Sequence, residues 1–178
     1  MTFAKSIRGF LEHNDRRLMR RVHRWRAPRW LRRWTVLVTR MGDGWLWYAL
    51  GLIILFFGGE QRFVAVGAGL AASLAGVLVF RQLKRISKRP RPYQVEPHCW
   101  AMLTTRDRFS FPSGHSMTAF SIMVSIGHFY PDLQLVLLVL ALSIAASRII
   151  LGMHYLTDVV VGAAIGIALG LASLYLFG

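Results

Sequence analysis

The chain has 178 residues, of which 54% are hydrophobic, yet it carries a formal net charge of +14. A solvated basic domain that binds nucleic acid would distribute its charge over amphipathic helices, whereas here the charge is excluded from long apolar runs. We therefore expect a multispanning membrane protein without a nucleic-acid partner, and the single cysteine, Cys99, excludes an intrachain disulfide.

Residues 1–40 are predicted to lie on the membrane surface as basic interfacial helices. Asp15 can cap a helix that runs to about Trp25, and Pro28 can open a second helix that runs to about Arg40. Arginines alternate with large apolar residues along both segments, which is typical of helices that lie on anionic headgroups. We interpret the segment as a topological anchor that binds anionic lipid, rather than as an arm for a specific partner.

Residues 41–178 are predicted to form the membrane-embedded domain, which gives an all-α bundle of about five spans. Glycines at spacing four in the last apolar run, Gly162, Gly166 and Gly170, should let that helix approach its neighbours closely. A bilayer core needs about 20 helical residues, so the first run is short for a span. The five apolar runs are residues 44–57, 63–80, 116–130, 133–147 and 155–177.

Ionisable residues gather between the last two apolar runs, where charge is costly and usually functional. His154 and Asp158 are four residues apart, so on a helix they share a face, and the carboxylate could orient the imidazole for nucleophilic attack. Gly152 is a natural helix terminator. We therefore expect Arg148 to close one helix and His154 to open the next, both at the same membrane surface.

Two earlier stretches carry features that suit an anion. Lys84 ends the second run, and Arg91 lies between two prolines that hold it extended. Ser113 can cap the third long helix, Gly114 leaves room for an anion at the free backbone N–H groups, and His115 stands at the same mouth. A basic stretch beside a span is also a common topological signal, so neither stretch assigns a function alone.

Together the three stretches resemble the signature of the type 2 phosphatidic acid phosphatase family, which is related to the vanadium haloperoxidases. The resemblance covers about residues 35–177, and it implies a metal-independent phosphohydrolase in an all-helical membrane fold. The residues that carry it are, in chain order, Lys84, Arg91, Pro92, Pro112, Ser113, Gly114, His115, Ser147, Arg148, His154 and Asp158.

The family pattern would make His154 the nucleophile that forms a phosphohistidine, Asp158 its orienting partner, and His115 the acid that protonates the leaving oxygen. Fixed cations and a helix N-terminus can supply the positive charge that phosphoryl transfer needs, so we expect neither a metal nor another cofactor. The alternative is a zinc site formed by the two histidines and the aspartate, although the cations would repel a divalent ion. The residues implied to bind the phosphate oxygens are Lys84, Arg91, Ser113, Gly114 and Arg148.

We interpret the chain as an integral membrane lipid phosphate phosphatase that hydrolyses a terminal phosphomonoester, of the phosphatidylglycerol phosphate or phosphatidic acid type. A polyprenyl (undecaprenyl) diphosphate phosphatase and a lipid A type phosphatase remain alternatives, because the sequence does not choose among lipids. A soluble haloperoxidase has no reason to be embedded among apolar spans, and the complete set of catalytic residue types disfavours a scaffold with a dead site. The link from Tyr93 to Phe111 is expected to shape headgroup choice.

The distribution of positive charge predicts the orientation in the membrane. With five spans, 21 of the 22 Lys and Arg residues lie on the side of the three motifs, and Arg62 alone lies opposite. Because positively charged loops stay in the cytoplasm, we expect an inner (plasma) membrane protein whose active site faces the cytoplasm. Several bacterial members of the family that the chain resembles are believed to act on the outer leaflet, so the resemblance and the charge count disagree, and we follow the count.

Overall fold

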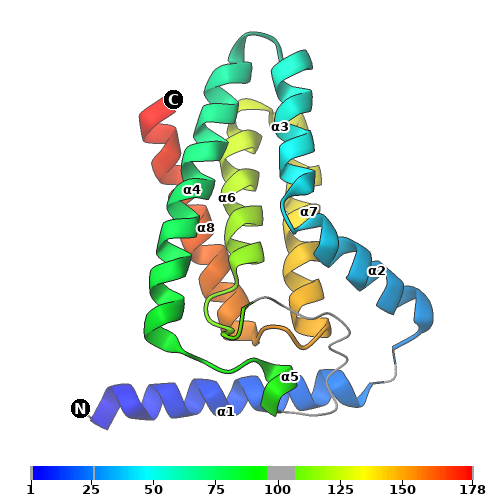
Figure 1. Cartoon of the computed structure of the whole chain (residues 1–178), viewed down its shortest axis with the longest axis vertical. Helices are drawn as coiled ribbons and strands as arrows, with labels where there is room; N and C mark the ends of the chain where they lie inside the picture. The colour runs from blue at the N-terminus through cyan, green and yellow to red at the C-terminus, as the bar shows by residue number, and fades with distance from the viewer. Residues whose placement is uncertain (1, 26, 96–106, 178) are drawn as a thin grey trace.

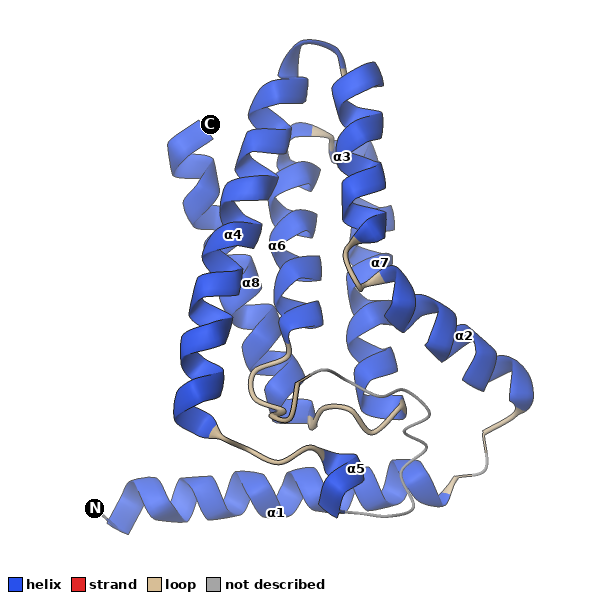
Figure 2. Ribbon diagram, in the orientation of Figure 1, coloured by secondary structure: helices blue, strands red, loops and turns tan. Residues whose placement is uncertain are grey.

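The computed structural model describes residues 2–25, 27–95 and 107–177, and within these residues the regular structure is helical apart from an isolated bridge between Pro90 and Phe109 (Figures 1 and 2). This confirms the predicted all-α class. The elements are α1 (Thr2–Arg24), α2 (Arg29–Met41), α3 (Trp45–Phe57), the 3-10 helix η1 (Gly59–Gln61), α4 (Arg62–Ser87), α5 (Pro92–Val95), α6 (Gly114–Phe129), α7 (Pro131–Ile150) and α8 (Leu156–Phe177).

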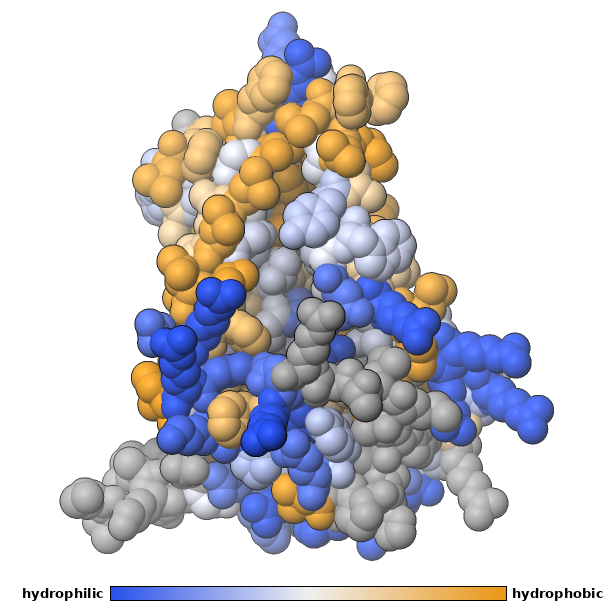
Figure 3. Space-filling model, viewed as in Figure 1, coloured by the Kyte–Doolittle hydropathy of each residue, from blue (hydrophilic) through white to orange (hydrophobic). Residues whose placement is uncertain are grey.

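Three of the helices are long and apolar enough to cross a membrane: Gly59–Ser87, Pro131–Ile150 and Leu156–Phe177. Helix α3 has 13 residues and α6 has 16, fewer than the roughly 20 that a bilayer core requires. On the face shown in Figure 3, apolar side chains cover much of the bundle below its hydrophilic tip, and hydrophilic side chains gather toward the lower end. The described residues thus contain three helices with the length and composition of a span, and two shorter bundle helices, α3 and α6, at the places of the other two predicted spans.

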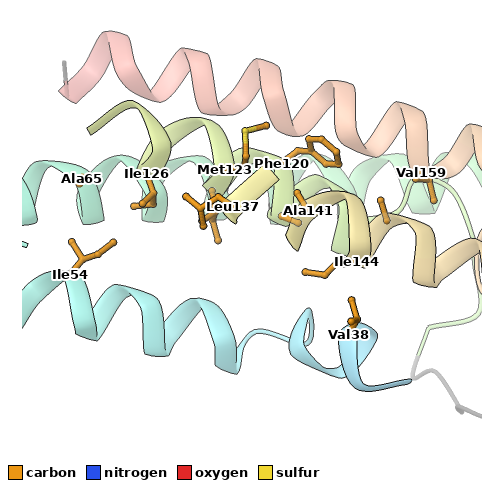
Figure 4. Close-up of a cluster of buried hydrophobic side chains, with 13 residues drawn as sticks. Val38, Ile54, Ala65, Phe120, Met123, Ile126, Leu137, Ala141, Ile144 and Val159 are labelled. Carbon is orange, nitrogen blue, oxygen red and sulfur yellow. The ribbon is translucent and has the colours of Figure 1, made fainter. Parts of the chain in front are cut away.

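Helix α6 is the central helix of the bundle, and ten of its residues are buried. Phe120, Met123 and Ile126 pack in one cluster with Leu137 and Ile144 of α7 (Figure 4). Helices α4 and α8 also pack against α6. The N-terminus of α6 is therefore held in place by neighbours on several sides.

The glycines of α8 allow this close packing, as predicted. A Cβ atom on Gly162 would lie 2.5 Å from the Ser113 carbonyl oxygen, and one on Gly166 would collide with the backbone of Met117. The Ser113 N–H also donates to the carbonyl oxygen of Asp158, at 2.9 Å. The first turns of α6 and α8 are consequently fixed against each other.

The two ends of the bundle differ, as the sequence predicts. The short α3–α4 and α6–α7 connections lie at one end, and helix α1, residues 88–95 and the α7–α8 turn lie at the other (Figure 1). Helix α1 runs crosswise beneath the bundle. The motif residues, at the last turn of α4, the first turn of α6 and the α7–α8 turn, therefore lie toward the end of the bundle that α1 crosses (Figure 1).

One expectation for the N-terminal segment is wrong. Asp15 does not open a helix in its segment, because α1 already begins at Thr2 and Asp15 lies inside it with only 3% of its surface exposed. Its carboxylate accepts hydrogen bonds from Arg89 Nη2, at 2.7 Å, and from the Thr157 hydroxyl. The capping signal was overridden by this tertiary ion pair, whereas the second helix, which follows Pro28 and ends at Met41, agrees with the prediction.

Candidate active site

The α7–α8 turn brings the predicted nucleophile next to Arg148. Helix α7 ends at Ile150, and Gly152 adopts a φ of +65°, a left-handed conformation that glycine accommodates without strain. The N–H groups of Met153 and His154 donate to the Arg148 carbonyl oxygen, at 3.0 and 3.2 Å. The predicted break at Gly152 is confirmed, although α8 begins at Leu156 and His154 lies in the turn before it.

Arg91 determines which nitrogen of His154 is free to react. Arg91 lies directly before α5, and its Nη1 donates to the Met153 carbonyl oxygen at 2.9 Å and lies 3.3 Å from His154 Nε2. A guanidinium group has only hydrogen-bond donors and no acceptor. Nε2 must therefore present its lone pair, and the ring proton of neutral His154 is on Nδ1.

Asp158 lies beside His154 but does not hydrogen-bond to it. The distance from His154 Nδ1 to Asp158 Oδ2 is 3.7 Å, beyond the length of a hydrogen bond. Oδ2 accepts instead from the Tyr155 N–H at 2.9 Å, and Oδ1 accepts from Arg89 Nη1 at 2.7 Å. The structure thus brings the predicted pair together, while Arg89 and the backbone fix the carboxylate.

His154 is 2% exposed, and this burial lowers its pKa well below the ordinary value for histidine. The positive charges of Arg148, Arg91 and Lys84 lower the pKa of His154 further. The imidazole is therefore neutral near pH 7, which is the form that can attack an electrophile.

The predicted phosphate-binding cations lie around this histidine, and two of them, Lys84 and Arg91, lie beside the carboxylate of Asp107. Lys84 donates to the Phe109 carbonyl oxygen at 2.9 Å and is paired with Asp107. Nη2 of Arg91 lies 3.7 Å from the same carboxylate oxygen. Nη1 of the buried Arg148 donates to the Thr39 hydroxyl at 2.5 Å.

The N-terminus of α6 completes the site. Ser113 is its N-cap, and its hydroxyl oxygen accepts from the Ser116 N–H at 3.4 Å, as predicted. At Gly114 a Cβ atom would lie 2.8 Å from the Phe80 ring, so a side chain would crowd this end of the helix. His115 Nε2 lies 2.8 Å from Asp43 Oδ1.

An apolar cavity of about 520 Å³ lies between α3, α4 and α6. Its wall includes Asp43, Gly114 and His115 at one end and otherwise consists mainly of apolar side chains, among them Leu70 and Ile122. A hydrophobic space therefore adjoins the polar site.

Sequence reasoning missed four residues that contact the predicted set, and a fifth, Asp15, that is linked to the set through Arg89. They belong to no motif, and only the structure shows what they touch. Acidic residues are a signal that could have found three of them, because the chain has only eight in total among 22 cationic residues. The five are Asp15, Thr39, Asp43, Arg89 and Asp107. Most of the link predicted to shape headgroup choice, residues 96–106, lies outside the described residues.

Comparison with known proteins identifies the family. The model of the PAP2 superfamily matches residues 62–178. The chain belongs to the PAP2 superfamily. A PAP2 relative, the decaprenylphosphoryl-5-phosphoribose phosphatase of Mycobacterium tuberculosis, is 35% identical over 130 residues, which cover 71% of this chain and 68% of the relative.

Two further PAP2 proteins support the same assignment. Phosphatidylglycerophosphatase B of Bacillus subtilis is 30% identical over 147 residues, covering 75% of this chain and 62% of the relative. The crystal structure of LpxE from Aquifex aeolicus superimposes with a TM-score of 0.73 at 28% identity, covering 89% of this chain and 93% of that one. The present chain is therefore a membrane-embedded lipid phosphatase of this superfamily.

Proposed function

We propose that this phosphatase hydrolyses the terminal phosphomonoester of a membrane glycerophospholipid, of the phosphatidylglycerol phosphate or phosphatidic acid type, through a phosphohistidine on His154. The observation that carries the proposal is that the buried, neutral His154 directs its Nε2 lone pair toward Arg91, with Lys84 and Arg148 nearby. Phosphoryl transfer needs such an in-line nucleophile among fixed positive charges.

Each residue then has a chemical task. His154 Nε2 attacks phosphorus, the bond from phosphorus to the lipid oxygen breaks, and His115 gives that oxygen a proton. Water then attacks the phosphohistidine while neutral His115 takes its proton, which restores both histidines. The Asp158 carboxylate, 3.7 Å from Nδ1, orients the imidazole through its charge. The phosphate oxygens are bound by Lys84, Arg91, Arg148, Ser113 and Gly114.

The lipid part of the substrate has a place beside this site. The cavity of about 520 Å³ is mainly apolar and reaches His115. A headgroup at the cations and an acyl chain in the cavity would satisfy both environments. This supports a lipid phosphate over a soluble phosphate ester.

The protein is further proposed to reside in the inner membrane with its active site facing the cytoplasm, and α1 is proposed to rest on anionic headgroups. The charge asymmetry supports the orientation. Exposed arginines on α1, such as Arg17 and Arg20, support the contact with lipid.

The test is phosphate release by the purified full-length chain in detergent micelles. The panel contains phosphatidylglycerol phosphate, phosphatidic acid, undecaprenyl diphosphate and lipid A 1-phosphate, each with and without EDTA. We expect the highest kcat/KM for one of the first two, unaffected by EDTA. Preference for the diphosphate or for lipid A would replace the proposed substrate by an alternative, and loss of activity in EDTA with recovery in zinc would revive the metal site.

A further inference from the structure

The turn between α2 and α3 contacts the ring of His115. A Cβ atom on Gly42 would lie 2.8 Å from His115 Cδ2, and Gly44 has a φ of +116° that favours glycine. The two glycines therefore let residues 42–44 approach the imidazole closely. Gly42 and Gly44 flank Asp43, whose side chain faces the same ring.

Asp43 engages one of the two nitrogens of this ring. Its Oδ1 lies 2.8 Å from His115 Nε2, across 72 positions of sequence. An ionised carboxylate only accepts hydrogen bonds, and the hydrogen bond from His115 lowers the pKa of Asp43, so the carboxylate is charged near pH 7. Nε2 therefore carries a proton and donates it to Asp43.

The other charged groups around His115 are positive. The positive charges of Arg148 of α7 and of Arg91 act on the His115 ring, and that of Arg40 of α2 acts on Asp43. The nearby His154 is neutral. Burial lowers the pKa of His115, and these positive neighbours lower it further. Within the described residues, Asp43 is the negative group that opposes this lowering at His115.

We propose that Asp43 is a positioning residue that orients His115 as the acid of the reaction and favours its doubly protonated form. The inference rests on the proposed function, in which His115 protonates the leaving oxygen. With Nε2–H held by Asp43, the Nδ1 proton is the one transferred, and Nε2–H stays in place. When water attacks the phosphohistidine, its proton goes to Nδ1 and the imidazolium is restored.

The first test compares leaving groups. Dioctanoyl phosphatidic acid releases an alcohol oxygen that needs a proton, whereas 4-nitrophenyl phosphate releases a stable phenolate that does not. Asp43→Asn keeps the shape of the side chain and removes its charge. Because a general acid contributes about 10²–10⁴-fold and Asp43 is half exposed, we expect kcat for the lipid to fall by about tenfold to a hundredfold, with little change for the nitrophenyl ester.

The second test uses pH and needs the lipid substrate alone. Without the carboxylate, protonated His115 is less stable, so the alkaline limb of kcat should move to lower pH by about one unit. Asp43→Glu should restore most of the limb, and Asp132→Asn, an exposed aspartate at the other end of the bundle, serves as the matched control. In a His115→Ala background, Asp43→Asn should cause no additional loss.

The inference would be overturned if the alkaline limb of kcat were unchanged in Asp43→Asn, or if kcat fell equally on both substrates. It would also be overturned if the losses of kcat were additive in the His115→Ala, Asp43→Asn double variant. In each case the contact between Asp43 and His115 would be structural only. Failure of the wild-type chain to release phosphate from any lipid would instead overturn the proposed function, so the two failures are distinguishable.

Discussion

His154 combines two properties that a histidine nucleophile needs, and neighbouring residues cause both. Arg91 Nη1, 3.3 Å away, requires a lone pair on Nε2, and the ring proton on Nδ1 faces the Asp158 carboxylate at 3.7 Å. Burial and the surrounding cations keep the ring neutral. A phosphate bound between these cations would be attacked by a group that is already in its reactive form.

The depressed pKa of His154 predicts the acid limb of the pH profile. Attack requires the neutral ring, and a lowered pKa keeps the ring neutral to lower pH, so kcat/KM should stay high through pH 6.5 and fall only below it. Arg91→Gln removes one positive neighbour and should move this limb to higher pH while it also lowers activity. The measurement is kcat/KM for dioctanoyl phosphatidic acid against pH, and a wild-type acid limb above pH 7 would contradict the assignment.

At the scale of elements, the contact between α6 and α8 positions the N-cap of α6 beside the first turn of α8. Gly162→Ala would place a methyl group 2.5 Å from the Ser113 carbonyl oxygen. We expect a cost of about 2 kcal/mol in stability from overpacking and, because small displacements are expensive in catalysis, at least about a tenfold loss of kcat.

Gly9→Ala provides the matched control for this change, since a Cβ atom there would meet nothing within 4 Å. It should leave the melting temperature in detergent unchanged or slightly raised, because alanine favours helix. Equal melting temperatures and kcat for Gly162→Ala and wild type would show that the α6–α8 contact does not position the site.

Helix α1 is joined to Asp158 through Arg89. Nη1 of Arg89 donates to Asp158 Oδ1 and Nη2 donates to Asp15 Oδ2, both at 2.7 Å. Thr157 extends the link, because its N–H donates to Asp15 Oδ1 at 3.2 Å. An amphipathic surface helix and the active site thus share one guanidinium group.

Asp15→Ala should therefore lower both the stability of the protein and kcat, although Asp15 lies outside the predicted site. Loss of one partner of a buried ion pair usually costs about 3–5 kcal/mol, and we expect about 2 kcal/mol because Arg89 keeps its bond to Asp158. Thermal unfolding and kcat in detergent measure the effect, with the exposed neighbour variant Asn14→Ala as control. If Asp15→Ala matched Asn14→Ala in both measurements, α1 would have no influence on the site.

At the scale of the whole molecule, the sequence predicted the helical class, the gathering of the motifs at one end and the break at Gly152. These features follow from local patterns, because apolar runs, a left-handed glycine and an N-cap serine act within a few residues. Asp43 and Arg89 escaped prediction because their partners, His115 and Asp158, lie 72 and 69 positions away. Such pairs form only when the bundle closes.

The orientation can be tested with paired single cysteines. With Cys99 replaced by serine, a cysteine at Glu60, exposed at the α3–α4 end, should react in intact cells with a membrane-impermeant maleimide. A cysteine at Arg24, exposed at the end of α1, should react only after permeabilisation. The reverse pattern would place the active site outside and make the charge-based prediction wrong.

The most direct test of the account is to trap the covalent intermediate. The purified chain is mixed with phosphatidic acid that carries a labelled phosphate, quenched with alkali within milliseconds, and digested for mapping of the label, because phosphohistidine survives base. We predict label on His154 of the wild-type chain and no label in His154→Ala. A variant that hydrolyses the phosphohistidine more slowly should accumulate more label. Label on another residue, or wild-type turnover by His154→Ala, would contradict the mechanism.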